Sequence, residues 1–208
     1  MEKSIENMKI IGLTGPSGAG KGFCYGYFKS QAIPCIDTDD VYHKLLIPPS
    51  ACVDELVENF GTEILTHSNT VDRKALAEIV FSDKTHSALK TLNAITHKYV
   101  IEKTKELLIG YRTSGSKAAV IDAPLLFEAD VDKMCDFTIA VISDATLRLE
   151  RIIERDTITK EAAQKRIESQ NPTDFYTSRA TYTVVNDTDA DGLYKQLKSI
   201  LKKEAIIG

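Results

Sequence analysis

The sequence lacks the features that mark membrane-spanning and secreted proteins. No apolar run approaches the roughly 18 residues that a membrane-spanning helix requires. The first seven residues are polar and charged, without the apolar segment of a secretory signal. We therefore expect a cytoplasmic protein with a polar N-terminal extension at residues 1–7. The 208 residues have room for one α/β core with an inserted subdomain, or for at most two small domains.

The spacing of cysteine and histidine also excludes several kinds of site. The four cysteines lie far apart and form no CxxC pair, namely Cys24, Cys35, Cys52 and Cys135. This pattern predicts reduced thiols rather than a disulfide framework or a metal centre. The four histidines form no HxH or HExxH spacing, which argues against zinc. A net charge of −4 gives no reason to expect nucleic-acid binding, so an anionic substrate would need a locally basic cleft.

Apolar segments alternate with segments of helical spacing along most of the chain, which predicts an α/β fold with a parallel sheet. We expect strands at residues 9–13, 33–36, 118–121, 137–141 and 181–185. We expect helices at residues 21–31, 145–155, 160–170 and 192–203. Residues 40–115 have a mostly helical pattern, including a long one at 87–109. This block is too long for a simple crossover and is a candidate substrate-binding insertion.

A glycine-rich segment after the first expected strand fits the phosphate-binding pattern G-x-x-x-x-G-K. Its residues are Gly15, Pro16, Ser17, Gly18, Ala19, Gly20 and Lys21. Glycines let backbone N–H groups approach phosphate oxygens, and the following helix N-terminus adds partial positive charge. Lys21 would reach the β- and γ-phosphates. Gly22 departs from the pattern, because a Ser or Thr hydroxyl normally binds Mg²⁺ there. We expect Gly15 to Lys21, with Gly22 and Phe23, to bind ATP.

Three carboxylates follow expected strands, where ligands bind in open α/β sheets. Asp37 and Asp39 follow the second strand, and either could accept the proton of an attacking hydroxyl. Asp37 could instead cap the next helix. Asp122 ends the third strand, in the position that supports Mg²⁺ in P-loop proteins, although strands also end in Asp for turn reasons.

Three arginines share one face of the helix expected at 145–155. Arg148, Arg151 and Arg155 are spaced i, i+3 and i+7. Guanidinium groups bind phosphate oxygens bidentately and stabilise transferring charge. Pairing with Glu150 and Glu154 on an ordinary solvated face is the alternative.

The order of the motifs resembles the dephospho-CoA kinase family along nearly the whole chain. The similar segments, after the phosphate loop, are Ile36–Asp39, Gly61, Asp72–Phe81, Leu92–His97, Asp122–Glu128, Arg151 with Arg155–Asp156, Arg166–Gln170 and Val184–Asp187. Asp122–Glu128 is close to the family's D-x-P-L-L-F-E and is the most specific of these segments.

This resemblance implies a kinase that uses ATP and Mg²⁺ to phosphorylate the ribose 3′-hydroxyl of dephospho-CoA. It implies a core at about 8–39, 116–155 and 180–205, an acceptor-binding insertion at about 40–115 and a lid at about 156–179. The implied catalytic residues are Asp39, as the base, and Lys21. The implied ATP-binding residues beyond the loop are Arg151, Arg155 and Asn186. The implied acceptor-binding residues are Asp39, Arg73, His97 and Leu125, and Asp122 would support the metal through water.

The sequence departs from the family at several positions. Gly22 replaces the usual hydroxyl, Lys98 stands where Pro is frequent, His43 where Arg is common, and Thr181 where Asp often follows Ala. Because only Arg151 and Arg155 match the family pattern, truncating Arg155 is expected to cost more than truncating Arg148. Another small-molecule P-loop kinase and a degenerate nucleotide binder remain alternatives. A GTPase switch is disfavoured, because the chain contains no N-K-x-D motif.

Overall fold

The computed structural model describes residues 8–208, and these divide into two compact units. The first unit contains a five-stranded sheet in the order β2-β3-β1-β4-β5. Its strands are β1 (Lys9–Thr14), β2 (Cys35–Asp37), β3 (Ala118–Asp122), β4 (Phe137–Ile142) and β5 (Tyr182–Val185). β1 pairs in parallel with β3 on one side and β4 on the other, and β4 pairs in parallel with β5. The carboxyl end of β1 therefore lies between two neighbouring strand ends, where α/β proteins bind ligands.

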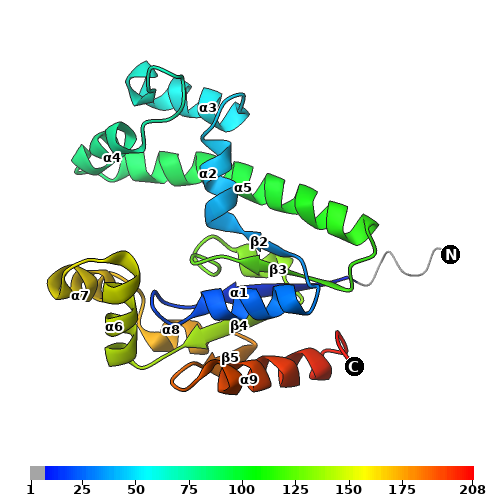
Figure 1. The fold of residues 1–208 in the computed structure, drawn as a ribbon. Helices are drawn as coiled ribbons and strands as arrows, with labels where there is room; N and C mark the ends of the chain where they lie inside the picture. The colour runs from blue at the N-terminus through cyan, green and yellow to red at the C-terminus, as the bar shows by residue number, and fades with distance from the viewer. Residues whose placement is uncertain (1–7) are drawn as a thin grey trace. The chain divides into compact units, whose positions relative to one another are not determined.

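Helices cover the sheet (Figure 1), and the apolar side chains of its strands are buried. The helices of this unit are α1 (Lys21–Ser30), η2 (Val131–Met134), α6 (Ala145–Asp156), α7 (Lys160–Glu168), α8 (Thr173–Thr177) and α9 (Ala190–Lys203). α1 and α9 pack against each other, with the rings of Tyr27 and Tyr194 stacked at 5.0 Å between centroids. The core joins these helices to fully buried strand residues such as Leu13 and Ile139. This packing holds the β1–α1 connection in place.

The second unit, residues 37–108, is helical and has its own apolar core. It contains α2 (Thr38–Leu45), α3 (Ala51–Phe60), η1 (Thr62–Ile64), α4 (Arg73–Ser82) and most of α5 (Ser87–Thr113). Leu56 and Ile64 are fully buried in this core. Glu55 of α3 accepts hydrogen bonds from Lys98 Nζ at 2.8 Å and Tyr99 Oη at 2.7 Å, which ties α3 to α5.

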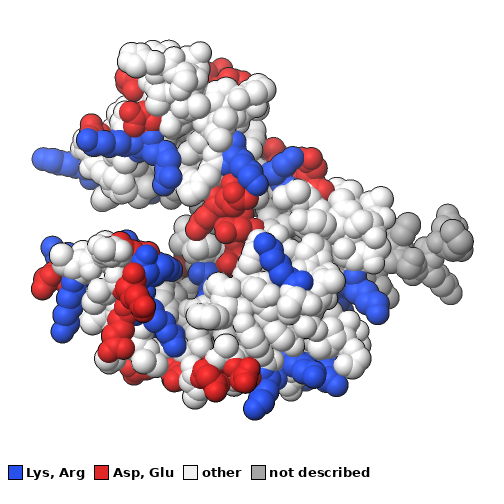
Figure 2. Space-filling view, viewed as in Figure 1, with Lys and Arg blue, Asp and Glu red and all other residues white. Residues whose placement is uncertain are grey.

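The α/β fold with a parallel sheet is confirmed, and each expected strand is present to within a few residues. The polar extension expected at residues 1–7 lies outside the described residues. No helix within residues 8–208 is long and apolar enough to cross a membrane. In the view of Figure 2, positively and negatively charged side chains are interspersed over the α6–α7 end of the first unit.

All four cysteines are free thiols. Burial raises the pKa of Cys24, Cys35 and Cys135 to about 12 and that of Cys52 to about 11. These side chains are therefore protonated and weakly nucleophilic at neutral pH, as expected for structural thiols.

Candidate active site

The phosphate loop leaves β1 through backbone conformations that only glycine adopts easily. Gly15 has φ 144°, and a Cβ there would lie 2.1 Å from the carbonyl oxygen of Val141. Gly18 has φ 78°, and a Cβ there would lie 2.6 Å from the carbonyl oxygen of Arg148. A side chain at either position would therefore clash with the backbone of β4 or α6. The loop ends where Lys21 begins α1, with Gly20 as the N-cap in a left-handed conformation.

Three successive carbonyl groups of the loop accept hydrogen bonds from side chains of α6 and of the residue after β5. Arg148 Nε donates to Ser17 O at 2.9 Å, Arg151 Nη1 to Gly18 O at 3.4 Å and Asn186 Nδ2 to Ala19 O at 2.8 Å. We call Arg148, Arg151 and Asn186 the carbonyl clamp. Arg148 and Asn186 are only 5% and 4% exposed, so both bonds to the loop are shielded from water.

The carbonyl clamp also orients the N–H groups of the loop. A trans peptide is planar, so the C=O of one residue and the N–H of the next point in opposite directions. Holding Ser17 O and Ala19 O therefore turns the N–H groups of Gly18 and Gly20 away from the clamp. The N–H of Ala19 is used inside the loop, where it donates to Pro16 O at 3.1 Å. Preoriented N–H groups form a binding site for phosphate oxygens without reorganisation when the ligand arrives.

The three arginines of α6 bind the phosphate loop and its neighbours, not Glu150 and Glu154. Besides Gly18 O, Arg151 donates to Ser143 Oγ at 3.0 Å and to Asn186 O at 2.9 Å. Arg155 is exposed and pairs mainly with Asp156, at 2.8 Å. Arg148 is the most buried arginine of the three and has the shortest bond to the loop, which favours a ranking opposite to the one drawn from the family pattern.

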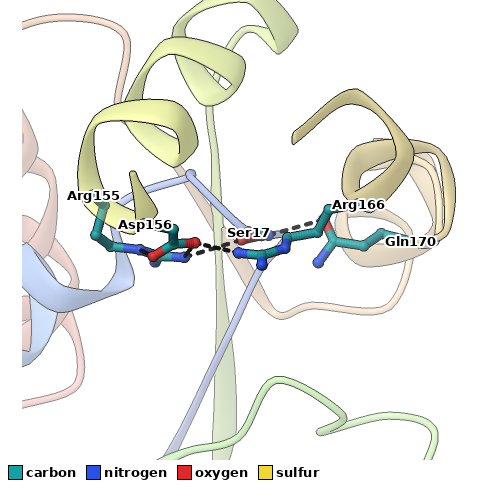
Figure 3. A network of polar contacts seen from close by, with 5 residues as sticks. All are labelled: Ser17, Arg155, Asp156, Arg166 and Gln170. Atoms are coloured by element: carbon teal, nitrogen blue, oxygen red, sulfur yellow. Dashed lines mark hydrogen bonds and ion pairs between the residues drawn. The ribbon is translucent and has the colours of Figure 1, made fainter. Parts of the chain in front are cut away.

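A polar network connects the loop to α7 (Figure 3). Asp156, at the end of α6, pairs with both Arg155 and Arg166 of α7. The hydrogen bond from Arg155 is the main reason that the pKa of Asp156 is lowered to about 2, with Arg166 adding to the effect. Ser17 joins the network through its hydroxyl, 3.5 Å from Arg155, and through its N–H, which donates to Gln170 Oε1 at 3.0 Å. Because its pKa is lowered to about 2, the carboxylate of Asp156 is ionised throughout the neutral pH range.

The residues expected to bear on Mg²⁺ binding are Asp122 and Gly22. Asp122 ends β3, paired in register with Leu13 of β1. A Cβ at Gly22 would meet no atom within 4 Å, so open space lies where a Ser or Thr hydroxyl normally stands. Within residues 8–208, no group of three or more His, Cys, Asp or Glu side chains is placed to hold a metal ion. This donor set fits Mg²⁺, which keeps several waters and binds one or two carboxylates together with substrate phosphates.

Three expected catalytic or acceptor-binding residues belong to the second unit. Asp37 caps α2 by accepting hydrogen bonds from the N–H groups of Asp39 and Asp40, at 2.9 and 3.2 Å. The capping interpretation of Asp37 is thereby confirmed, and Asp39 is exposed in the first turn. Arg73 begins α4 and is exposed. His97 lies in α5, where burial lowers its pKa.

The remaining expected residues, Phe23 and Leu125, belong to the first unit. Phe23 and Leu125 are 53% and 52% exposed, so both apolar side chains are accessible to a ligand.

Two residues that depart from the family pattern make contacts within the protein. Lys98 pairs with Glu55, and Thr181 exchanges hydrogen bonds with Thr138 of β4 at 3.0 and 3.1 Å.

The sequence placed Arg148 on an arginine face that could bind phosphate but not among the expected ATP-binding residues, and it gave Gln170 no role of its own. Arg148 Nη2 donates to Gln170 Oε1 at 3.0 Å, and both side chains bind the backbone of Ser17. The available signals were the position of Arg148 on the arginine face and the position of Gln170 at the end of Arg166–Gln170. Neither signal indicates that both side chains bind the backbone of Ser17.

A parallel sheet with strand order 2-3-1-4-5 and a glycine loop leading from its central strand to a lysine at a helix N-terminus defines a P-loop nucleotide-binding protein of the kinase type. The family model described as dephospho-CoA kinase matches residues 9–192. The chain belongs to the dephospho-CoA kinase family and is an enzyme of the kinase class.

Individual proteins agree with this assignment. The chain is 36% identical to the dephospho-CoA kinase of Lactobacillus johnsonii over 93% of its length and 97% of the relative. It is 36% identical to the dephospho-CoA kinase of Fusobacterium nucleatum over 92% and 96% of the two chains. A solved structure from Thermus thermophilus has a TM-score of 0.81 at 27% identity, covering 98% of this chain and all of the other.

Proposed function

We propose that this enzyme transfers the γ-phosphoryl group of ATP to the ribose 3′-hydroxyl of dephospho-CoA, giving CoA and ADP, the last step of CoA biosynthesis. The observation that carries this proposal is the match of the dephospho-CoA kinase family to residues 9–192, a span that includes the phosphate loop. The loop has the backbone that phosphate binding requires, with its carbonyls held and its N–H groups turned away from the clamp.

In the proposed mechanism the protein positions two reactants and moves one proton. Loop N–H groups and Lys21 hold the β- and γ-phosphates and stabilise the charge of the transferred group. Asp39 accepts the proton of the 3′-hydroxyl while the 3′-oxygen bonds to the γ-phosphorus. The bond between the γ-phosphorus and the departing ADP oxygen breaks in the same step. Mg²⁺, when bound, neutralises charge on the phosphates, and Asp122 would hold it through water.

We assign acceptor binding to the helical insertion at about 40–115, with Arg73 and His97 among its contacts, and with Leu125 contributing from the core. A neutral imidazole at His97 suits a hydrogen-bonding role, because burial lowers its pKa. Residues 156–179, which include α7 and α8, would form the lid that excludes water from the transfer. Free thiols suit a reducing compartment, so we place the reaction in the cytoplasm.

An acceptor panel tests the proposed substrate. Purified enzyme with ATP and Mg²⁺ is supplied in turn with dephospho-CoA, adenosine, AMP and shikimate, and ADP release is followed in a coupled assay. Of these four acceptors, we expect only dephospho-CoA to increase the release of ADP. Faster turnover with another acceptor would overturn the substrate and favour a different small-molecule kinase. ATP binding without turnover on any acceptor would favour a degenerate nucleotide binder.

A further inference from the structure

The two backbone polar groups of Ser17 are both held by one pair of side chains. Arg148 Nε donates to the carbonyl oxygen of Ser17 at 2.9 Å, and Gln170 Oε1 accepts from its N–H at 3.0 Å. Arg148 Nη2 closes the ring by donating to the same Gln170 oxygen at 3.0 Å. Three hydrogen bonds therefore fix the peptide groups on both sides of Ser17.

Arg148 is buried in a way that an ordinary surface arginine is not. The residue is 5% exposed, and its guanidinium donates to two neutral oxygens, those of Ser17 and Gln170. Burial lowers the pKa of the guanidinium. Burying a guanidinium without a carboxylate partner is unfavourable. Its burial here places fixed hydrogen-bond donors against the phosphate loop.

Gln170 connects this arrangement to the segment that leads out of α7. The next residue, Asn171, donates to Glu128 Oε1 at 2.6 Å, in the loop that follows β3. Two consecutive residues thus bind the phosphate loop and the Asp122–Glu128 segment. A displacement of the chain at Gln170 would pull directly on the N–H of Ser17.

We propose that Arg148 and Gln170 are positioning residues for phosphoryl transfer, which hold the peptides around Ser17 so that the N–H of Gly18 stays directed at the phosphate. The proposal rests on the proposed function only in that the loop binds ATP, and it holds for any acceptor. Neither side chain needs to touch the nucleotide. Their contribution comes from fixing the loop before the ligand arrives, and misplacement of a reacting group by about 1 Å can cost roughly 10²-fold in rate.

The test replaces Gln170 by residues that cannot hold Ser17. Gln170→Met has similar length without an acceptor, and Gln170→Asn keeps an amide that is one methylene too short. Gln164→Met is the matched control, because Gln164 is exposed in α7 and bonds only to Glu168 within the helix. For each variant we would measure the melting temperature, the exchange rate of the Ser17 amide by NMR and the Kd for ATP without acceptor.

We expect both Gln170 variants to melt near the parent temperature, to exchange the Ser17 amide at least about tenfold faster and to bind ATP about tenfold more weakly. Gln164→Met should match the parent in all three measurements. In a double-mutant cycle, Arg148→Met should add little to Gln170→Met, because both act on the same peptides. Unchanged exchange and unchanged ATP affinity in the Gln170 variants, or additive losses in the cycle, would overturn the proposal. Because no acceptor is present, failure of the dephospho-CoA assignment would leave these measurements unaffected.

Discussion

At the scale of single residues, the proposed mechanism assigns the proton transfer to Asp39. Asp39 stands in the first turn of α2, at the position that the family resemblance gives to the base. We predict that Asp39→Asn lowers kcat by about 10² to 10⁴, the usual contribution of general-base assistance, with little change in ATP affinity.

The neighbouring carboxylate provides the control for this prediction. Asp40 is exposed and pairs with Lys44 at 2.7 Å on the surface of α2. Asp40→Asn removes a similar charge one residue away and should leave kcat within about twofold, as expected for a surface pair. Near-parental turnover in Asp39→Asn, or an equal loss in both variants, would refute the assignment of Asp39 as the base.

Gly22 is the residue at which the phosphate loop breaks its own pattern. A Cβ at this position would meet no atom within 4 Å, so there is space for a serine side chain. We predict that Gly22→Ser lowers the Mg²⁺ concentration needed for half-maximal activity, because its hydroxyl can replace a water in the metal shell. The measurement is a Mg²⁺ titration of activity at fixed ATP and acceptor.

A second glycine of α1 separates metal binding from helix stability in this experiment. Gly26 is also surrounded by open space, and serine there gains the same helix propensity, less than about 1 kcal/mol. Gly26→Ser should raise stability without moving the Mg²⁺ midpoint. An equal shift in both variants, or none in Gly22→Ser, would show that no water is replaced at Gly22.

At the scale of elements, α6 acts as a support for the phosphate loop. Arg148 is buried against Ser17, whereas the Arg155 side chain is 60% exposed and pairs with Asp156. We predict that Arg148→Met lowers kcat/KM for ATP about tenfold or more, and that Arg155→Met costs less. Steady-state kinetics on both variants, with melting curves to confirm folding, decides the order. A larger loss for Arg155→Met would restore the ranking that the family pattern suggested.

The elements themselves follow from local patterns in the sequence. Apolar runs predicted all five strands, and the i, i+3 spacing placed the arginines on one face of α6. The bonds of the carbonyl clamp were not predictable in the same way. Arg148 and Ser17 are 131 positions apart, and Asn186 and Ala19 are 167 apart. Only the order of strands in the sheet brings these residue pairs together. In each pair a side chain bonds to a backbone carbonyl, which every residue type has, so the partner's identity does not signal the contact.

The capping of α2 shows a different limit of sequence reasoning. Asp37 fitted both a cap and a catalytic carboxylate, because either role places an acid directly after a strand. The structure decides through geometry, since one carboxylate oxygen of Asp37 accepts from two backbone N–H groups. This bond begins α2 and fixes the turn that carries Asp39.

At the scale of the whole molecule, the chain separates nucleotide chemistry from the helical insertion. The described part of the first unit contains the sheet, the phosphate loop and the carbonyl clamp, while residues 37–108 have an apolar core of their own. The fold and the loop of the first unit thus account for nucleotide use.

The most direct test of the account follows the γ-phosphoryl group itself. Parent enzyme and Lys21→Ala are incubated with γ-labelled ATP, Mg²⁺ and dephospho-CoA, and the labelled product is identified by mass spectrometry and phosphorus NMR. We predict that the parent places the label on the ribose 3′-oxygen, giving CoA, and that Lys21→Ala loses both transfer and ATP affinity. A parent that binds ATP but leaves dephospho-CoA unlabelled, or labels another position, would contradict the account.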